Sequence, residues 1–407
     1  MEDPLSIEDY VEHFPPLLPS EEVHDTSRYM LEHCPVVHSD RDGGFWVVNR
    51  YKDCLKVLQD WKSFTNGNLG HRVPNDPPGL NRPLMPPIDY NPPIHRHFRE
   101  LMNPYLSQQR LDRHEPGFRR IISGLLDEFA AKGECDLAGD FAHKFPAQLT
   151  FVELFSVTDE DELAHMRELV RRLNYMRHTV PPEESAKLQR QLDAWVYALV
   201  ARRRAEIRID DIVDGLLHGT VEGGRPLTDD EVVGAVQILI SGGFSTSSDA
   251  TCNIMVRLIE EPGLEALLRD KPELIPDAIE EVMRLDPPVN TRPRRCVVDT
   301  EIGGRVIPAG ERVLVNYGAA NHDPREFPDP ERFDVHRAAS KPLTFSAGPH
   351  RCIGSNMARM SLRIVVEEFF ERGTDFRFAD GQGERRVSFS PGAWRACDSL
   401  PITFTPR

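Results

Sequence analysis

The sequence predicts a mainly α-helical fold with a minor antiparallel β part. One observation is a helical stretch of about 32 residues that begins at Thr228, far longer than a typical globular helix. A second is a pair of short strand signals around Gly303-Gly304. A third is composition: 40% of the residues are apolar, 28% are charged and the mean hydropathy is −0.43, as in folded, water-soluble proteins.

The N-terminal half is predicted to be helical after one short strand. The apolar run Phe45–Val48, followed by Arg50-Tyr51, indicates the strand. The pattern from about Pro93 to Phe155 is mostly helical. The stretch Glu183–Gly219 is predicted to be helical too, with charged residues on solvated faces.

The segment from Thr228 to Glu260 carries the strongest helix signals. Thr228 and Glu231 form a capping-box pattern, and Pro262 follows the far end. Apolar residues occupy nearly every face between Val232 and Ile240. This half of the helix should therefore cross the interior of the molecule.

The C-terminal third alternates between helix and strand signals. Gly303-Gly304 suits a two-residue turn between strands. Gly373 is placed to end the last helix in the left-handed conformation. The expected elements are a helix near 277–285, a hairpin at 301–306, a strand at 312–317 and a helix at 355–372.

Composition and cysteine usage narrow the class of protein. The net charge of −16 argues against a nucleic-acid binder. The first residues lack a signal-peptide pattern, and no run of about 18 apolar residues indicates a membrane span. Seven scattered cysteines without a C-x-x-C pair fit a reduced cytoplasm rather than a disulfide framework or zinc ribbon. Neither repeats nor long linkers occur, so residues 1–407 are expected to form one domain.

The segment Phe345–Gly354 holds the densest chemical signal. It places Cys352 in a glycine-bounded loop directly before the last predicted helix. Backbone N–H groups and the helix dipole stabilise negative charge there, so the position favours a thiolate. Gly348 and Gly354 permit tight turns and close approach of a flat ligand, and Phe345 can shield the sulfur. Taken alone, a cysteine in such a position is more often a buried structural residue.

The spacing Phe-x-x-Gly-x-His-x-Cys-x-Gly resembles the haem-binding loop of the cytochrome P-450 family, in which the cysteine is the axial iron ligand. Four further family patterns occur upstream in family order, and the resemblance runs from Phe45 to Phe404. Each pattern is weak alone, and their shared order carries the resemblance. They are the H-x-x-x-R of His95–Arg99, the mid-helix Gly242–Thr246, the E-x-x-R of Glu281–Arg284 and the P-E-R-F of Pro330–Phe333.

The resemblance implies haem b between the long central helix and the cysteine loop, with Cys352 as its axial ligand. It also implies a structural network of Glu281, Arg284 and Arg332, in which the planar guanidinium suits carboxylate pairing. Each implied haem-binding cation, taken singly, suits a surface charge as well. The implied haem contacts are His95, Arg99, Arg294 and His350 toward the propionates, and Phe345, Gly348, Gly354, Gly242 and Gly243 near the ring.

Two residues of the central helix are the implied catalytic groups. Thr246 matches the family threonine whose hydroxyl hydrogen-bonds bound oxygen; its alternative role is to bond back to its own helix. Ser245 departs from the family, which usually has an acid there to bring protons. A serine hydroxyl relays protons but is a poor source of them, so Asp249 and solvent are the expected substitutes.

Positions matched to the family's substrate pocket are mostly apolar. They favour a hydrophobic substrate of terpenoid, steroid or polyketide size, to which Asn290 or Ser241 would offer a hydrogen bond. Each position suits core packing equally well. The positions are Leu84, Met85, Ile238, Ser241, Val289, Asn290, Ala393 and Trp394.

Electrons are expected from a small ferredoxin and a separate reductase, because the chain leaves no room for a fused redox domain. Ferredoxins are acidic, and six arginines would form a basic patch on the cysteine side of the haem. Scattered solvated arginines are the alternative. The six are Arg96, Arg99, Arg110, Arg113, Arg351 and Arg359.

These features together predict a cytoplasmic haem-thiolate monooxygenase. It would insert one atom of O2 into a hydrophobic small molecule and reduce the other to water, with no nucleic acid or membrane as partner. Three alternatives stay open. Ser245 suits a peroxide-using or oxygen-rearranging enzyme. The others are a haem-binding sensor or carrier without turnover, and a non-haem protein with a structural Cys352.

Overall fold

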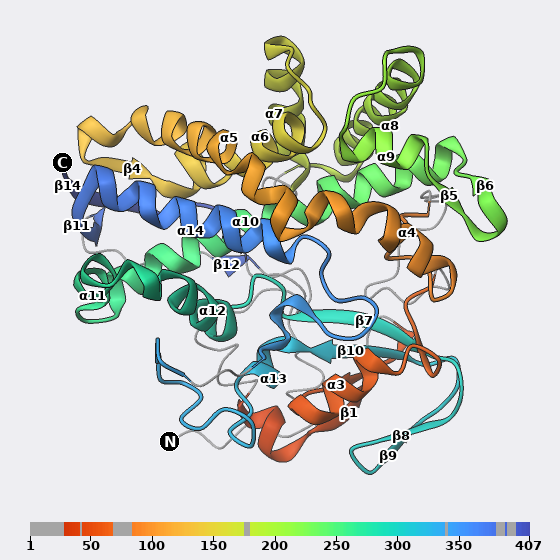
Figure 1. The fold of residues 1–407 in the computed structure, drawn as a ribbon. Helices are drawn as coiled ribbons and strands as arrows, with labels where there is room; N and C mark the ends of the chain where they lie inside the picture. Colours follow the sequence, from red (N-terminus) through yellow and green to blue (C-terminus); the bar gives the residue numbers. More distant parts are fainter. Residues whose placement is uncertain are drawn as a thin grey trace.

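Helix α10 (Asp229–Glu260) crosses the centre of the computed structural model (Figure 1). The structure describes residues 28–40, 43–67, 84–174, 180–337, 341–379, 387–388 and 396–407. The predicted capping box is confirmed: the Thr228 hydroxyl accepts from the Glu231 N–H, and the Glu231 carboxylate accepts from the Thr228 N–H. Between Val232 and Ile240 every residue is buried except the half-buried Ile238, so α10 crosses the interior as its sequence predicts.

Two long helices, α5 (Gln108–Asp127) and α14 (Ser355–Arg372), lie side by side (Figure 1). Ion pairs join them: Arg119 of α5 lies 2.7 Å from Glu368 of α14, and Arg363 of α14 lies 2.8 Å from Glu115 of α5. Apolar side chains of both helices share one core with α11 (Leu264–Asp270), α12 (Ile275–Leu285) and the second half of α10.

The region 93–155 is largely helical, as predicted, with interruptions. Its regular helices are α4 (Ile94–Met102), α5 and α6 (Phe145–Gln148). π-Helical turns at Leu137–Ala142 and Leu149–Leu154 flank α6. The short strand β4 (Glu134–Asp136) also breaks the pattern.

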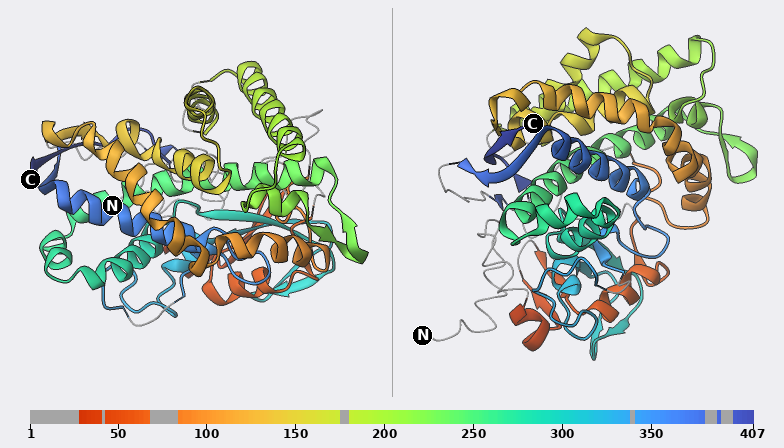
Figure 2. Two further views of the ribbon diagram at one scale, coloured as in Figure 1. Left: turned by 45° about the horizontal axis from the view of Figure 1, so that its top comes forward. Right: turned by 60° about the vertical axis from the view of Figure 1, so that its left-hand side comes forward.

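The helical prediction for 183–219 is only partly correct. Helix α8 (Pro182–Ala205) ends early, and α9 (Ile212–Leu217) begins again because the Asp211 carboxylate accepts from the Asp214 N–H at 2.9 Å. Helices α7 (Glu160–Asn174) and α8 project from the rest of the molecule (Figure 2). Among the described residues, no helix combines the length and apolar character that crossing a membrane requires.

A five-stranded sheet lies on the opposite side of α10 from α7 and α8 (Figure 1). Its strand order is β1-β2-β10-β7-β3. Three pairings are antiparallel, but β10 pairs with β2 in parallel, with Leu314 opposite Val47, so the expected antiparallel part has one exception. The strands are β1 (Val36–Ser39), β2 (Phe45–Val48), β3 (Phe64–Thr65), β7 (Thr291–Cys296) and β10 (Arg312–Asn316).

Two glycines predicted to shape turns behave differently. The hairpin glycines Gly303 and Gly304 have φ values of 55° and 80°, which confirms the predicted tight turn. The prediction for Gly373 is wrong: it has φ −157° and opens an extended strand. Glycine is needed there because a Cβ would lie 2.4 Å from Phe404 Cδ2.

The remaining strands are short and form small separate sheets. The described part includes a three-stranded sheet in the order β11-β14-β4. The strands are β5 (Thr220–Val221), β6 (Arg225–Pro226), β8 (Thr300–Ile302), β9 (Arg305–Ile307), β11 (Gly373–Phe378), β12 (Val387–Ser388), β13 (Ala396–Cys397) and β14 (Pro401–Pro406).

Candidate active site

The segment 345–354 forms a closed loop before α14. The Cys352 N–H donates to Phe345 O at 2.8 Å, which closes the loop. Gly348 has φ +68°, and a Cβ there would lie 2.4 Å from Leu58 O of α3 (Tyr51–Gln59), so the protein's own backbone already requires glycine. A Cβ at Gly354 would meet no atom within 4 Å, so this glycine borders open space.

The environment of the Cys352 sulfur balances two opposing effects. Cys352 keeps accessible surface, yet enough protein surrounds the sulfur that desolvation raises the pKa of its thiol. Opposing groups lower that pKa and favour the thiolate. They are the Gly354 N–H and the guanidinium groups of Arg99, Arg292 and Arg351.

Helix α4 brings His95 and Arg99 to the cysteine loop. His95 is buried against His350, with ring centroids 4.5 Å apart, and its Nε2 has no hydrogen-bond partner in the described part of the chain. Desolvation, followed by the Arg99 charge, lowers the pKa of His95 to about 4. Arg99 Nη1 donates to Arg351 O at 2.8 Å, and no described carboxylate pairs with this cation. Both groups suit an anionic ligand.

Strand β7 contributes a buried cation, Arg294. Arg294 Nη1 donates to Asn66 Oδ1 at 3.0 Å, and no carboxylate among the described residues forms an ion pair with Arg294. Desolvation lowers the pKa of its guanidinium, while the nearby Tyr317 acts in the opposite direction. A buried cation without a carboxylate is costly unless an anion is supplied, so Arg294 also suits an anionic ligand.

The middle of α10 presents open backbone. Ser241 and Gly242 are exposed although the helix crosses the centre of the molecule, and a Cβ at Gly242 would meet no atom within 4 Å. At Gly243 a Cβ would make only ordinary contact, 3.7 Å from Thr150 Oγ1. Packing therefore requires neither glycine, and the face at Gly242 has room for a flat group.

The Thr246 hydroxyl and the Asp249 carboxylate near this face already form hydrogen bonds within the protein. Thr246 Oγ1 donates to Gly242 O at 2.7 Å, the back-bonded arrangement that the sequence left as an alternative. Asp249, the expected substitute proton source, is buried and accepts from the Cys397 N–H at 3.1 Å. This carboxylate anchors β13, so it is a poor replacement for the acid that Ser245 lacks.

The structural network contains Glu281 and Arg284 as expected, but its third member is Arg337. Arg284 contacts both Glu281 oxygens, at 2.8 and 2.9 Å, and Arg337 Nε lies 2.9 Å from Glu281 Oε1. The assignment of Arg332 is wrong: its side chain is 68% exposed and pairs with Asp334. The chain turns between the two arginines, and sequence spacing does not show which one returns to Glu281.

The network reaches the start of the cysteine loop. Arg284 Nη1 donates to Asn321 O, and Asn321 Oδ1 accepts from the Leu343 N–H at 2.7 Å. Thr344 Oγ1 donates to Met283 O at 2.6 Å. Through these bonds α12 positions the segment that leads to Cys352.

Two site residues escaped the sequence analysis. Arg292 lowers the pKa of Cys352, and it lies two positions before Arg294 on β7, so the period-two alternation of a strand was the available signal. Tyr317 donates its hydroxyl to Ser346 Oγ of the cysteine loop at 3.0 Å. No local pattern indicated that contact, because the two residues are 29 positions apart.

The structure brings part of the expected substrate set to α10. A Cβ at Gly234 would lie 1.9 Å from Leu84 O, so the segment of Leu84 and Met85 packs directly on that helix, one turn before Ile238. Val289 is buried. Asn290 is buried as well, and its Nδ2 has no hydrogen-bond partner in the described structure. Ala393 and Trp394 lie outside the described residues.

The six arginines of the expected basic patch are not equivalent. Arg110 forms an ion pair with Asp210 at 2.7 Å, Arg359 pairs with Glu280, and Arg99 points to the loop backbone. The other three are exposed, and no described carboxylate pairs with them: Arg96, Arg113 and Arg351.

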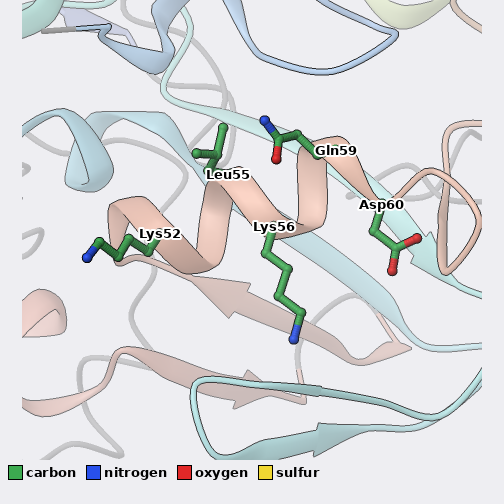
Figure 3. Close-up of a pocket in the computed structure, with 5 residues that line it drawn as sticks. All are labelled: Lys52, Leu55, Lys56, Gln59 and Asp60. Carbon is green, nitrogen blue, oxygen red and sulfur yellow. The ribbon is translucent and has the colours of Figure 1, made fainter.

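A surface pocket on α3 lies among Lys52, Leu55, Lys56, Gln59 and Asp60 (Figure 3). Its lining includes none of the residues that carry the chemistry above. Lys56 Nζ donates to Glu301 O at 2.9 Å, which joins α3 to β8. The pocket therefore adds nothing to the cysteine site.

Comparisons with known proteins agree on one family. The sequence profile of cytochrome P-450 matches residues 45–379. Cytochrome P-450 107B1 of Saccharopolyspora erythraea is 32% identical over 366 residues, which cover 88% of each chain. Linalool 8-monooxygenase of Pseudomonas putida is 30% identical over 97% of this chain and 98% of its own. The crystal structure of CYP108D1 from Novosphingobium aromaticivorans has a TM-score of 0.85 at 25% identity, with 99% of both chains covered.

The fold around α10 and the thiol loop before α14 define a haem-thiolate enzyme. The chain belongs to the cytochrome P-450 family and is a monooxygenase. Proteins of this family carry haem with a cysteine thiolate as axial ligand. The residues present fit such a group, because a thiol, the buried Arg294 and half-buried Arg99 without described carboxylate partners, and an open glycine face occur together.

Proposed function

We propose that Cys352 is the axial ligand of haem b and that this monooxygenase oxidises a hydrophobic small molecule with electrons from a ferredoxin. The observation that carries the ligand assignment is the sulfur's setting. It keeps accessible surface before α14, with the Gly354 N–H and three guanidinium groups favouring its thiolate. The other described cysteines are buried or half-buried.

The haem would be held by cations on separate elements. His95 and Arg99 of α4, Arg294 of β7 and His350 of the loop would bind its propionates. The open backbone of α10 would face the ring. When bound, the haem supplies the activation of O2. The neighbouring residues would be Phe345, Gly348 and Gly354 on the loop side and Gly242 and Gly243 on α10.

Thr246 and Ser245 would manage protons on the α10 side. The Thr246 hydroxyl donates its hydrogen to Gly242 O and keeps lone pairs that can accept from a proton donor. Ser245 would pass protons from water but cannot hold one as an acid. This difference also favours a second candidate function, a peroxide-driven enzyme, which turnover with peroxide alone in place of reduced ferredoxin and O2 would reveal.

The substrate would be largely apolar, of terpenoid, steroid or polyketide size. Leu84, Met85, Ile238 and Val289 would offer it apolar contacts. The unpartnered Asn290 Nδ2 and the exposed Ser241 would offer hydrogen bonds. A relative that acts on linalool supports this class. Ala393 and Trp394 are proposed as substrate-pocket residues on the family resemblance alone.

The ferredoxin would dock on the cysteine side of the molecule. Arg96, Arg113 and Arg351 would supply the positive charge, since they are exposed and no described carboxylate neutralises them. Arg110 and Arg359 are already ion-paired and would contribute less.

The test is the reduced CO complex of the purified protein. It should show the red-shifted Soret band of a thiolate ligand, and Cys352→Ala should lose it. Cys135→Ala, which removes a half-buried thiol from β4, is the matched control and should keep the band. A Cys352→Ala protein that retains the band would overturn the assignment.

A further inference from the structure

Tyr317 joins two parts of the site that lie far apart in the chain. It is buried at the start of α13 (Tyr317–Asn321), and its hydroxyl donates to Ser346 Oγ of the cysteine loop at 3.0 Å. The same phenol lies near the Arg294 guanidinium of β7 and opposes the desolvation that lowers the pKa of that group. We propose that Tyr317 is a positioning residue that holds closed the loop carrying Cys352. The inference rests on the proposed function, since it takes Cys352 as the iron ligand.

The phenol has one hydrogen, and the bond to Ser346 uses it. The Arg294 guanidinium lies near the phenol, and a nearby cation polarises the O–H group and strengthens its bond to Ser346. Arg294 is fixed from its other side by Asn66 Oδ1, 3.0 Å from Nη1. This bond keeps Arg294 beside the phenol that contacts the cysteine loop.

The backbone of Ser346 shows what the bond from Tyr317 holds in place. Ser346 has φ 60° and ψ −176°, a conformation that glycine adopts and other residues rarely do. This φ sets the orientation of the peptide between Phe345 and Ser346, whose carbonyl accepts the Cys352 N–H at 2.8 Å. Glycine would adopt the conformation without strain, yet the chain has a serine whose hydroxyl Tyr317 engages. The hydrogen bond from Tyr317 therefore keeps the loop closed around Cys352.

Tyr317→Phe retains the ring and removes the hydrogen bond to Ser346. In haem-loaded protein at moderate urea, the thiolate Soret band of the ferrous CO complex should disappear about fivefold faster than in the wild type, the factor expected for one net hydrogen bond. Far-UV circular dichroism should stay unchanged over the same interval, which separates loss of the ligand from unfolding. Haem transfer to apomyoglobin should also accelerate, because the loop that holds Cys352 opens more readily.

Tyr51→Phe is the matched control. Tyr51 is another buried tyrosine, and its hydroxyl donates to Lys341 O, just before the cysteine loop, at 2.7 Å. That bond does not involve Ser346, so this variant should keep the wild-type rate of band loss. In a Ser346→Gly background, which lacks the hydroxyl, Tyr317→Phe should have little further effect on band loss.

Equal rates for the Tyr317 and Tyr51 variants, or a wild-type rate for Tyr317→Phe, would overturn the inference. An additive effect of Tyr317→Phe in the Ser346→Gly background would do the same. A wild-type protein without the thiolate band would refute the proposed ligand instead, so the two failures are distinguishable.

Discussion

Removing Arg337 should destabilise the protein far more than removing Arg332. The side chains of Arg337 and Glu281 are only 11% and 5% exposed, and Nε lies 2.9 Å from Oε1. Truncating one partner of a buried pair costs about 3–5 kcal/mol, because the remaining charge is stranded. Arg284 still neutralises Glu281 in part, so we expect the lower end, about 3 kcal/mol, for Arg337→Ala. Arg332 is 68% exposed, so Arg332→Ala should change stability by no more than about 0.5 kcal/mol.

Urea unfolding of the haem-loaded protein, followed by circular dichroism and by the Soret band, measures this difference. The midpoint should fall for Arg337→Ala with little change in the slope. Glu281 is connected through Arg284 and Asn321 to the start of the cysteine loop. The urea midpoint of this variant followed by the Soret band should therefore fall together with the midpoint followed by circular dichroism. Comparable destabilisation by the two alanine variants, or none from Arg337→Ala, would refute the network as described.

Three further outcomes are expected. Arg113→Gln should slow reduction by a ferredoxin several-fold at low salt and less at high salt. Arg110→Gln removes an ion-paired cation and should have little effect. Equal effects of the two variants, or an equal loss of reduction rate with a chemical reductant, would contradict the docking proposal. Ser245→Asp should raise the fraction of electrons that reach product and lower peroxide release, and Thr246→Ala should lower coupling in either background; unchanged or worse coupling in Ser245→Asp would mean that protons arrive by another route. Burial lowers the pKa of His95 to about 4, so in haem-free protein the unfolded chain takes up the proton first as pH falls, and the free energy of unfolding should drop by about 3 kcal/mol between pH 6.5 and 4. His95→Gln should abolish that part of the pH dependence, and an unaltered profile would show that His95 is not buried as a neutral imidazole.

Features governed by neighbours in sequence could be predicted from the residues alone. The capping box at Thr228, the Gly303-Gly304 turn and the helix after Cys352 depend on bonds between residues a few positions apart. The family resemblance was equally visible, because its patterns are short spacings. The boundaries of the irregular regions could not be predicted. The π-helical turns around α6 arise from packing, and α9 begins where the Asp211 carboxylate accepts one hydrogen bond.

Contacts between distant segments required the tertiary structure. Spacing could not show that Arg337 returns to Glu281, because the chain turns again between Arg332 and Arg337. Gly373 was misjudged because it pairs with Pro406 of β14, and that pairing holds it in the extended conformation. Tyr317 offered no local signal at all. A residue and its near neighbours in sequence determine the local backbone conformation and the local charge. The partner of a buried polar group depends instead on which distant segments the packed core brings within hydrogen-bond distance.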